Sequence, residues 1–356
     1  MQRVIHEYRN KSRLFTQIEQ LYTYISDTEF MYDDILWLDD VFADVCQILQ
    51  EKLLMFRTPT LKNFDMPVFD VPVKDKEIIV CLSGGKDSAA CAYYYVKKGY
   101  KVHLYHMHGV NKAYGDEQKA AKRIADYLGC DLYTETIKLA GIKPDYIEHP
   151  LKNYIIANGA IHYALAKGYS PVIATGNFNQ SKLDMNEFEI CGGDCVEMWD
   201  AYEKIIRKII PNFRVEIPLA TNADTFNLLA DDWELFSLAV SCMSPYRFRE
   251  HWKHRTEQQY NIKLFDSRCG CCWKCCVEAI WLMDTGKMDY NEKYYLHSLG
   301  ILAMTLWRES DIQIFDIDTI WENYMWYDMK ESKAYDILKN CTIKYTTKSG
   351  AARILF

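Results

Sequence analysis

The sequence lacks several features that would place it in a familiar class of protein. No apolar run approaches the roughly 18–20 residues that span a bilayer. The residues after Met1 contain no apolar signal-peptide core, and neither internal repeats nor low-complexity segments occur. We therefore expect a globular, cytoplasmic protein that has no membrane partner.

An excess of positive charge is also absent. The chain carries 42 Lys and Arg residues against 49 Asp and Glu residues, for a formal net charge of −7. This balance disfavours broad attachment to nucleic acid and makes a small molecule the expected partner. The 356 residues, of which 49% are hydrophobic, are enough for one large domain or for two to three smaller ones with cores of their own.

The most informative stretch is the glycine turn, Ser83-Gly84-Gly85-Lys86-Asp87-Ser88. An apolar run precedes it at residues 78–82 and an alanine-rich run follows it at 89–93, which predicts a buried strand that turns into a helix. Adjacent glycines let a ligand approach the backbone closely, and the first N–H groups of the helix point toward that ligand. We therefore expect the glycine turn to bind phosphate.

Two common phosphate-binding patterns are missing from this stretch. Neither G-x-x-x-x-G-K-[ST] nor G-x-G-x-x-G can be fitted to the glycine turn, so hydrolysis of a γ-phosphate loses its usual support. Instead, Ser-Gly-Gly-x-Asp-Ser resembles the PP-loop of the ATP pyrophosphatases. That group includes asparagine synthetase, GMP synthetase and the tRNA thiolation enzymes. The resemblance implies that ATP binds here and that pyrophosphate is the leaving group.

The same resemblance implies a role for each residue of the turn. The hydroxyls of Ser83 and Ser88, together with backbone N–H groups, would hold the pyrophosphate. Lys86 would add positive charge, and Asp87 would help to place Mg²⁺. The expected catalytic residues are Ser83, Lys86, Asp87 and Ser88, and the expected nucleotide-binding set adds Gly84, Gly85 and Gly176.

Strand and helix patterns alternate around the glycine turn. The expected strands cover residues 76–82, 102–107, 131–137 and 171–175, and the expected helices include 88–98 and 153–166. This alternation is typical of a doubly wound α/β fold, in which helices cover both faces of a mostly parallel sheet. The PP-loop resemblance implies the adenine nucleotide alpha-hydrolase type of this fold. Ligands of such sheets bind at the carboxyl ends of the strands, where the glycine turn lies.

A second constellation is formed by cysteines. Of the 13 cysteines, five fall within residues 269–276, a density that favours a metal over disulfides. Cys269, Cys272 and Cys275 form the pattern C-G-x-C-x-x-C, in which three thiolates can surround one ion. Tetrahedral Zn²⁺ requires a fourth ligand, for which Cys242 is the candidate. An iron–sulfur cluster on the same thiolates is the alternative.

The glycine turn and the distant cysteine pattern together resemble the 7-cyano-7-deazaguanine synthase (QueC) family. The resemblance implies zinc on Cys242, Cys269, Cys272 and Cys275. The separation between Cys242 and Cys269 is clearly longer here than in the family. We therefore expect the charged segment 246–263 to loop out, or Cys271 or Cys276 to replace Cys242 as a ligand.

Weaker similarities to that family extend the resemblance over roughly residues 76–283. They include Lys152-Asn153, the strand that ends at Gly176, Asp194-Cys195 and Pro218-Leu219. The resemblance implies that Lys152, Asn153 and Asp194 contact the substrate, since a carboxylate can accept two hydrogen bonds from a purine-like base. Lysine stands at 152 where the family has arginine, and Gly192-Gly193 replaces Tyr-Pro, so an altered substrate is as well supported as the family's own.

We expect four regions along the chain. They are a helical N-terminal extension and linker (1–72), a PP-loop ATP-binding domain (73–235), a cysteine-rich zinc subdomain (236–285) and a C-terminal helical extension (286–356). The balance turns basic from Lys330 onward, which is typical of a solvated helix and tail, with a docking strip as the alternative.

The QueC resemblance implies an enzyme that uses ATP to activate a carboxylate on a 7-deazapurine-like base. Ammonia or another amine then attacks, as in queuosine biosynthesis, and relatives serve DNA modification and antiviral defence. A tRNA sulfur-transfer or amidation enzyme is one alternative. Another is a non-catalytic nucleotide-binding subunit of a complex. We expect ATP, Mg²⁺ and Zn²⁺ as cofactors, a homo-oligomer, and protein partners bound through the N- or C-terminal extension.

Overall fold

The computed structural model describes residues 70–108, 114–136, 149–176, 199, 202–204, 206–207, 210–219, 222–242, 244, 246–309, 333–339, 342–346 and 351–355. Residues 1–69 of the expected N-terminal extension and the candidate substrate residue Asp194 lie outside these ranges. Two compact units divide the chain, Met1–Thr221 and Asn222–Phe356. Among the described helices, none is long and apolar enough to cross a membrane.

The described part of the first unit is built on a parallel sheet. Its strands are β1 (Glu77–Cys81), β2 (Lys101–His108), β3 (Asp131–Thr136), β4 (Val172–Ala174) and β5 (Arg214–Glu216). They lie in the order β3-β2-β1-β4-β5, and each neighbouring pair is parallel. The predicted parallel sheet is confirmed. β5 was not predicted, because its residues Arg214, Val215 and Glu216 form no apolar run, unlike the equally short β4.

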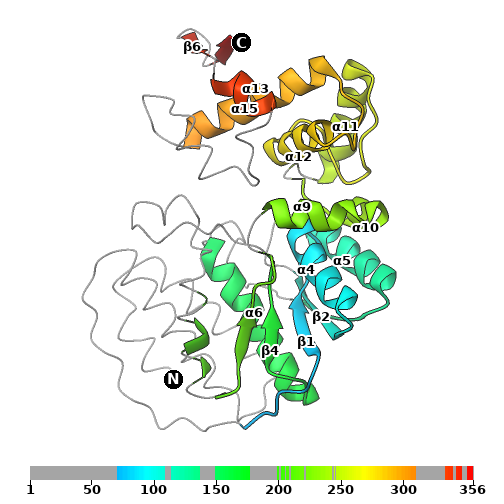
Figure 1. Ribbon diagram of the computed structural model, residues 1–356, viewed down its shortest axis with the longest axis vertical. Helices are drawn as coiled ribbons and strands as arrows, with labels where there is room; N and C mark the ends of the chain where they lie inside the picture. The colour runs from blue at the N-terminus through cyan, green and yellow to red at the C-terminus, as the bar shows by residue number, and fades with distance from the viewer. Residues whose placement is uncertain are drawn as a thin grey trace, which may run out of the picture. The chain divides into compact units, whose positions relative to one another are not determined.

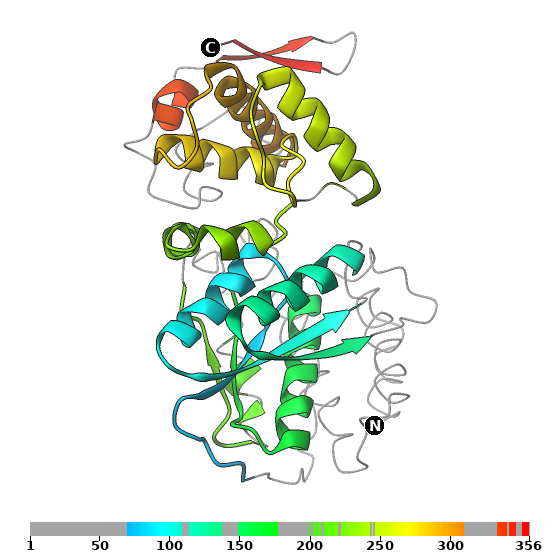
Figure 2. The same ribbon diagram turned by 90° about the vertical axis from the view of Figure 1, so that its right-hand side faces the viewer.

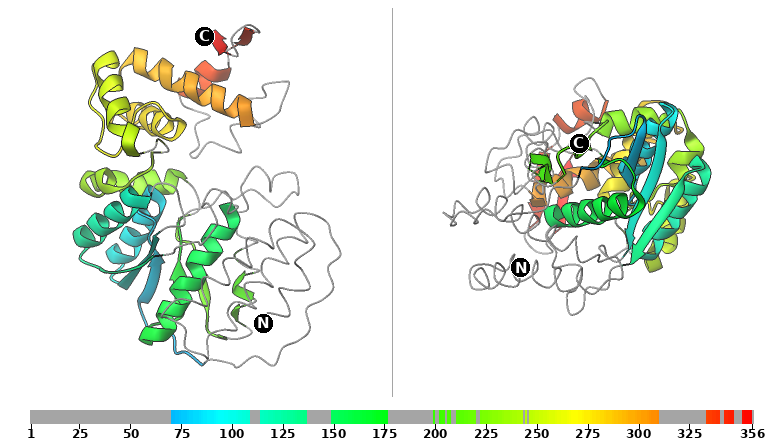
Figure 3. Two further views of the ribbon diagram at one scale, coloured as in Figure 1. Left: turned by 180° about the vertical axis from the view of Figure 1, so that it is seen from behind. Right: turned by 90° about the horizontal axis from the view of Figure 1, so that it is seen from below.

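In the described part of this unit, three helices cover the two faces of the sheet. They are α4 (Lys86–Lys97), α5 (Tyr114–Leu128) and α6 (His149–Lys167). Figure 1 shows α4 and α5 on one face and α6 on the other, and the views in Figure 3 agree. The doubly wound arrangement is thus confirmed. Since β1 lies at the centre, its residues Ile78, Ile79 and Val80 are fully buried, each stabilising the fold by roughly 1.5–3 kcal/mol.

A buried carboxylate fastens the amino ends of the strands. Glu77 on β1 accepts hydrogen bonds from the backbone N–H of Ser170 (3.0 Å), from Nε2 of His103 (3.2 Å) and from Nζ of Lys101 (3.3 Å). Desolvation raises the pKa of Glu77, but the hydrogen bonds from His103 and Ser170 outweigh it and lower this pKa to about 2. Glu77 is therefore ionised at neutral pH and holds β2 and the chain before β4 against β1.

The second unit is mainly helical in its described part. It contains α9 (Asn222–Ala230), α10 (Trp233–Leu238), α11 (Tyr246–Tyr260), α12 (Trp273–Asp284), α13 (Glu292–Glu309) and α15 (Lys333–Lys339). α12 supplies much of the core, where the ring of Trp281 stacks on that of Phe226 at 4.7 Å. The antiparallel pair β6 (Thr342–Thr346) and β7 (Ala351–Leu355) follows, as Figure 2 shows.

Two segments of this unit differ from their predictions. Residues 246–260, which we expected to loop out, form the helix α11, because they contain neither proline nor glycine and need no apolar stripe while one face stays in water. The basic C-terminal stretch is not helical throughout, since it ends in the β6–β7 pair. These strands are short, and pairing with each other supplies the hydrogen bonds that local propensity alone does not reveal.

Candidate nucleotide site and metal centre

The glycine turn lies at the point where the order of the strands in the sheet reverses. The chain leaves β1 through this turn, enters α4 and continues to β2, whereas β4 pairs with the other side of β1. A point of this kind is where doubly wound sheets bind their ligands. Gly176, just after β4, lies against the start of α4, because a Cβ atom at this position would stand 2.9 Å from Cβ of Asp87. The structure therefore places Gly176 beside the glycine turn.

Gly84 has a backbone that only glycine accommodates. Its φ of +89° lies in the region that side chains disfavour, and a Cβ atom would meet the carbonyl oxygen of Glu117 at 2.5 Å. Gly85 is the N-cap of α4, and no side chain caps the helix there by a hydrogen bond. The turn is thus packed tightly on α5, and the N-terminus of α4 keeps backbone donors for a ligand.

The two serines of the turn form a closed hydrogen-bond network. The hydroxyl of Ser88 donates to the carbonyl oxygen of Gly85 (3.1 Å), so the Ser83 hydroxyl donates to Oγ of Ser88 (2.9 Å). The backbone N–H of Ser83 also donates to Oγ of Ser88 (3.1 Å), and that of Gly85 to Oγ of Ser83 (3.2 Å). These bonds fix the positions of both hydroxyls within the turn.

Lys86 and Asp87 form an ion pair within the glycine turn. Nζ of Lys86 lies 2.5 Å from Oδ1 of Asp87, and the lysine side chain is 8% exposed whereas the aspartate side chain is 40% exposed. A phosphate group can compete for the ammonium, while the more exposed carboxylate remains accessible to a cation.

The remaining candidate substrate residues are placed only in part. Lys152 and Asn153 both lie on α6, where Asn153 is half-buried, and the side chain of Lys152 is outside the described part. Sequence reasoning overlooked His106 on β2, whose Nδ1 lies 2.8 Å from the carbonyl oxygen of Leu82, directly before the glycine turn. A carbonyl oxygen only accepts, so Nδ1–H of His106 donates to it and steadies the start of the turn, while burial lowers the pKa of the His106 ring. His106 and His108 stand at alternate positions of β2, and this pattern is the sequence signal that could have identified His106.

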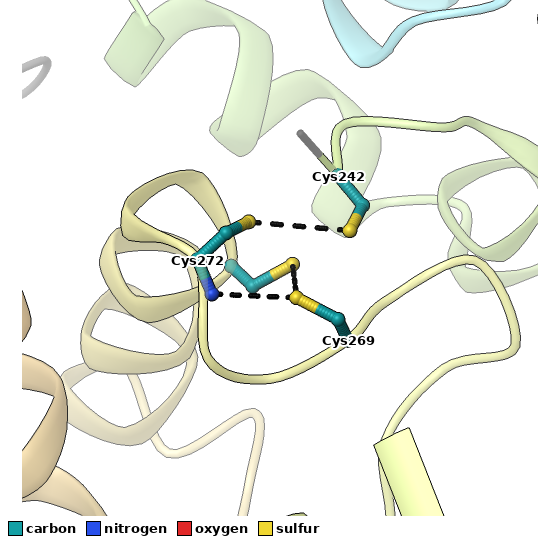
Figure 4. Close-up of side chains that lie close together, drawn as sticks. Cys242, Cys269 and Cys272 are labelled. Atoms are coloured by element: carbon teal, nitrogen blue, oxygen red, sulfur yellow. Dashed lines mark hydrogen bonds between the residues drawn. The ribbon is translucent and has the colours of Figure 1, made fainter. Parts of the chain in front are cut away.

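Four cysteines of the second unit converge on one point. The Sγ atoms of Cys242, Cys269, Cys272 and Cys275 all lie within 4.8 Å of one another. The Sγ–Sγ distance is 4.0 Å both for Cys269–Cys275 and for Cys272–Cys242. A tetrahedral zinc ion with Zn–S bonds of about 2.3 Å holds its sulfur ligands about 3.8 Å apart. The arrangement therefore fits one ion, and Figure 4 shows Cys242, Cys269 and Cys272 directed toward one another.

The local chain conformation explains this convergence. Cys272 is the N-cap of α12 and Cys275 lies in its first turn, so the helix dipole favours negative charge on both sulfur atoms. Gly270 turns the chain back toward Cys269 with a φ of +73°, and a Cβ atom there would lie 2.4 Å from Cδ1 of Leu264. Cys242 joins from the segment that follows α10.

The surroundings of Cys269 stabilise a thiolate. Its Sγ accepts hydrogen bonds from the Ser244 hydroxyl (3.0 Å) and from the backbone N–H groups of Cys272 (3.3 Å) and Cys271 (3.4 Å). Hydrogen bonds from the thiols of Cys242 and its neighbours lower the pKa of Cys269, whereas those with Cys242 and Cys269 raise the pKa of Cys275. The thiol of Cys269 therefore ionises more readily than that of Cys275, and a bound cation would favour the thiolate form of all four cysteines.

The two alternative cysteine ligands are not part of this group of four. Cys276 points elsewhere, because its Sγ lies 3.8 Å from the carbonyl oxygen of Gly270, and burial raises its pKa to about 12. Cys271 is half-buried with its Sγ 3.7 Å from that of Cys269. Since Cys242 reaches the cluster despite the long separation, neither Cys271 nor Cys276 is required to replace it.

A buried ion pair braces the segment next to Cys269. Nε of Arg268 lies 2.6 Å from Oε1 of Glu278 on α12, and Nη2 lies 3.1 Å from Oε2. Both side chains are almost fully buried, and Arg268 also donates to the carbonyl oxygen of Ala239. Arg268 therefore links two segments to Glu278 on α12: the one that leads to Cys269 and the one that leads to Cys242.

Comparison with known proteins points to one family. Residues 77–144 match the sequence model of the family described as queuosine biosynthesis protein QueC. The chain is QueC-like in this region. The match includes the whole glycine turn and none of the four clustered cysteines.

Two curated relatives also match this chain over a short segment. 7-Cyano-7-deazaguanine synthase 2 of Sulfurisphaera tokodaii is 38% identical over 71 residues, which is 19% of this chain and 15% of that protein. 7-Cyano-7-deazaguanine synthase of Sulfolobus acidocaldarius is 31% identical over 97 residues, which is 26% of this chain and 19% of that protein. The matched segment thus spans less than a fifth of either relative.

Solved structures are similar only at a coarse level. A predicted subunit of tRNA methyltransferase from Methanocaldococcus jannaschii is 22% identical, over 44% of this chain and 88% of that chain, with a TM-score of 0.24. NMN synthetase from Francisella tularensis is 12% identical, over 78% of this chain and 98% of that chain, with a TM-score of 0.27. Because both scores are low, we base no functional argument on them.

Proposed function

We propose that this protein is a QueC-like PP-loop enzyme that uses ATP to activate a carboxylate on a 7-deazapurine-like base. The observation that carries the proposal is the glycine turn, which stands at the switch point of the sheet, lies against Gly176 and falls within the QueC-matched segment. The turn leaves backbone donors at the start of α4 and holds two fixed hydroxyls, as a pyrophosphate leaving group requires.

The proposed chemistry has two steps. A carboxylate oxygen of the base attacks the α-phosphorus of ATP, and the bond to the bridging oxygen breaks so that pyrophosphate leaves. Ammonia or another amine then attacks the acyl carbon, loses a proton, and AMP leaves. The residues of the turn would stabilise the charge on pyrophosphate. The hydroxyl protons of Ser83 and Ser88 would turn from their partners within the turn to the phosphate oxygens, and the first N–H groups of α4 would donate beside them.

Binding of the nucleotide would rearrange the charges of the turn. The Lys86–Asp87 pair separates, because the ammonium gains a phosphate partner. Asp87 is then the carboxylate that would hold Mg²⁺, which supplies charge neutralisation on the phosphates. Lys152, Asn153 and Asp194 remain our candidates for contacts with the base.

We further propose that the four cysteines hold one zinc ion. Four thiolates leave no open position, which is typical of a structural rather than a catalytic zinc site. A cluster with several iron atoms would need room between the thiolates, whereas these sulfur atoms lie close enough to surround a single ion. The zinc would then join the segment after α10 to the start of α12.

The activity is tested with purified protein, ATP, Mg²⁺ and 7-carboxy-7-deazaguanine, with and without ammonia. We expect pyrophosphate release that depends on the carboxylate, and mass spectrometry should detect the adenylate and, with ammonia, the amide. A nitrile would form only if a second ATP activates the amide oxygen, which then leaves with AMP. A carboxylate that neither stimulates pyrophosphate release nor changes in mass would contradict the deazapurine substrate. ATP–pyrophosphate exchange with a different carboxylate would still support the proposal that the PP-loop activates a carboxylate with ATP.

A further inference from the structure

The helix between Cys242 and Cys269 contacts both halves of the cysteine site. Arg249 on α11 is 3% exposed, and its Nη2 donates to the carbonyl oxygens of Ser244 (3.0 Å) and Cys242 (3.5 Å). Thr256, seven positions later on the same helix face, is 5% exposed and donates from Oγ1 to the carbonyl oxygen of Cys269 (3.2 Å). α11 thus binds the backbone of two cysteines that lie far apart in the sequence.

Further contacts make α11 part of the walls of the site. A Cβ atom at Gly270 would lie 2.8 Å from Cγ2 of Thr256, so the helix packs directly on the turn between Cys269 and Cys271. Oε1 of Glu257 accepts from the backbone N–H of Leu264 (2.8 Å), which fastens the chain that leads from α11 to Cys269. The long separation between the cysteines is therefore bridged by a helix anchored at both ends.

We propose that α11 is a clamp for the metal centre, with Arg249 and Thr256 as positioning residues that hold the backbone of Cys242 and Cys269. This inference rests on the metal ion of the proposed function and adds the residues outside the ligand set that determine how well it binds. A free segment of this length would make closure of the site entropically costly, and the clamp removes much of that freedom.

The positive charge of Arg249 gives this residue a second role at the metal site. One Zn²⁺ ion with four thiolates carries a net charge of −2 in a site whose cysteines are mostly buried. The buried guanidinium of Arg249, bonded to the Cys242 carbonyl, lies close enough to offset part of that charge. Thr256 holds the backbone of Cys269 but carries no charge. Comparing variants of Thr256 and Arg249 therefore separates the effect of backbone positioning from the effect of charge.

The test uses the full-length protein and measures metal binding alone, without ATP or substrate. The variants are Arg249→Met, Arg249→Lys and Thr256→Val, and the matched control is Arg255→Met. Arg255 lies exposed on the same helix with its guanidinium 5.4 Å from the Trp252 ring centroid. Zinc affinity is measured by competition with a chromophoric chelator, and the geometry of the four thiolates by the absorption bands of the Co²⁺-substituted protein. Far-UV circular dichroism checks folding.

We expect Arg249→Met to weaken zinc binding by roughly 10- to 100-fold and Thr256→Val by a smaller factor, with Arg249→Lys in between. The Co²⁺ absorption bands of Arg249→Met and Thr256→Val should shift, while those of Arg255→Met should match the wild type. Wild-type affinity and unchanged Co²⁺ bands in folded Thr256→Val and Arg249→Met would overturn the clamp. If Arg249→Met fails to fold, Thr256→Val decides the question alone. A wild-type protein that binds no zinc or cobalt would overturn the metal proposal itself.

Discussion

Gly176 and Asp87 lie in contact across the switch point of the sheet. A Cβ atom at Gly176 would stand 2.9 Å from Cβ of Asp87 and 3.1 Å from its carbonyl carbon. The end of β4 is therefore pressed against the first turn of α4, where the proposed nucleotide phosphates bind. The absence of a side chain at residue 176 is what allows this approach.

Gly176→Ala should impair nucleotide use by more than it impairs folding. The added methyl group displaces Asp87 and the start of α4, and we expect ATP–pyrophosphate exchange to fall roughly 10- to 100-fold. Gly129→Ala is the control, because Gly129 has a φ of +64° and open space around it. That variant should lose about 1 kcal/mol of stability through backbone strain and keep its exchange rate. Equal exchange rates for both variants would show that the contact has no role in nucleotide binding.

Ser83→Ala should abolish most pyrophosphate release and leave the fold intact. In the structure the Ser83 hydroxyl accepts from the Gly85 N–H and donates to Ser88. In the proposed nucleotide complex its proton would turn to the leaving group, so the variant loses that donor. We expect a loss of roughly 100-fold in the rate of pyrophosphate release. Ser237→Ala, which removes a hydroxyl bonded only locally to the Glu234 carbonyl, serves as the control. A Ser83→Ala enzyme as fast as that control would exclude the hydroxyl from the mechanism.

Metal content should distinguish among the clustered cysteines. We expect Cys242→Ser to lose bound zinc, because its Sγ belongs to the group of four within 4.8 Å. Cys271→Ser and Cys276→Ser should retain one zinc ion per chain, as measured by elemental analysis of the purified proteins. Zinc retained in Cys242→Ser and lost in Cys271→Ser would mean that Cys271 is the fourth ligand.

Glu77→Gln should remove a pH-dependent part of the stability. The pKa of Glu77 falls from 4.5 to about 2 in the folded protein, so the carboxylate stabilises the fold fully above pH 4.5 and this contribution is lost as the pH falls toward 2. The shift corresponds to roughly 3 kcal/mol. Urea unfolding of the wild type and variant should show a stability difference that shrinks between pH 5 and about 2. A difference that does not depend on pH would contradict the assignment to Glu77.

Removing one partner of the Arg268–Glu278 pair should be costly. Arg268→Met leaves the Glu278 carboxylate buried without its guanidinium, and we expect the free energy of unfolding to fall by roughly 3–5 kcal/mol. The double variant Arg268→Met/Glu278→Leu should recover much of this loss, since no buried charge remains. A double variant no more stable than the single one would show that the bonds from Arg268 to nearby carbonyls matter more than the ion pair.

The sequence alone determined those features whose signals are local. The glycine turn was identifiable from two adjacent glycines between an apolar run and an alanine-rich run, and this pattern predicted the strand, the turn and the helix. The doubly wound sheet followed from alternating patterns, because crossover connections between parallel strands have a preferred hand. The pattern C-G-x-C-x-x-C identified three of the four clustered cysteines for the same reason, since one turn contains them.

Tertiary structure decided what depends on segments that are distant in the chain. The contact between Gly176 and Asp87 exists because β4 pairs with β1, a fact that no local pattern contains. Whether Cys242 or Cys276 completes the cysteine group depended on how α11 returns the chain to Cys269. β5, β6 and β7 were missed because they contain no continuous apolar run, and pairing with their partner strands stabilises them instead.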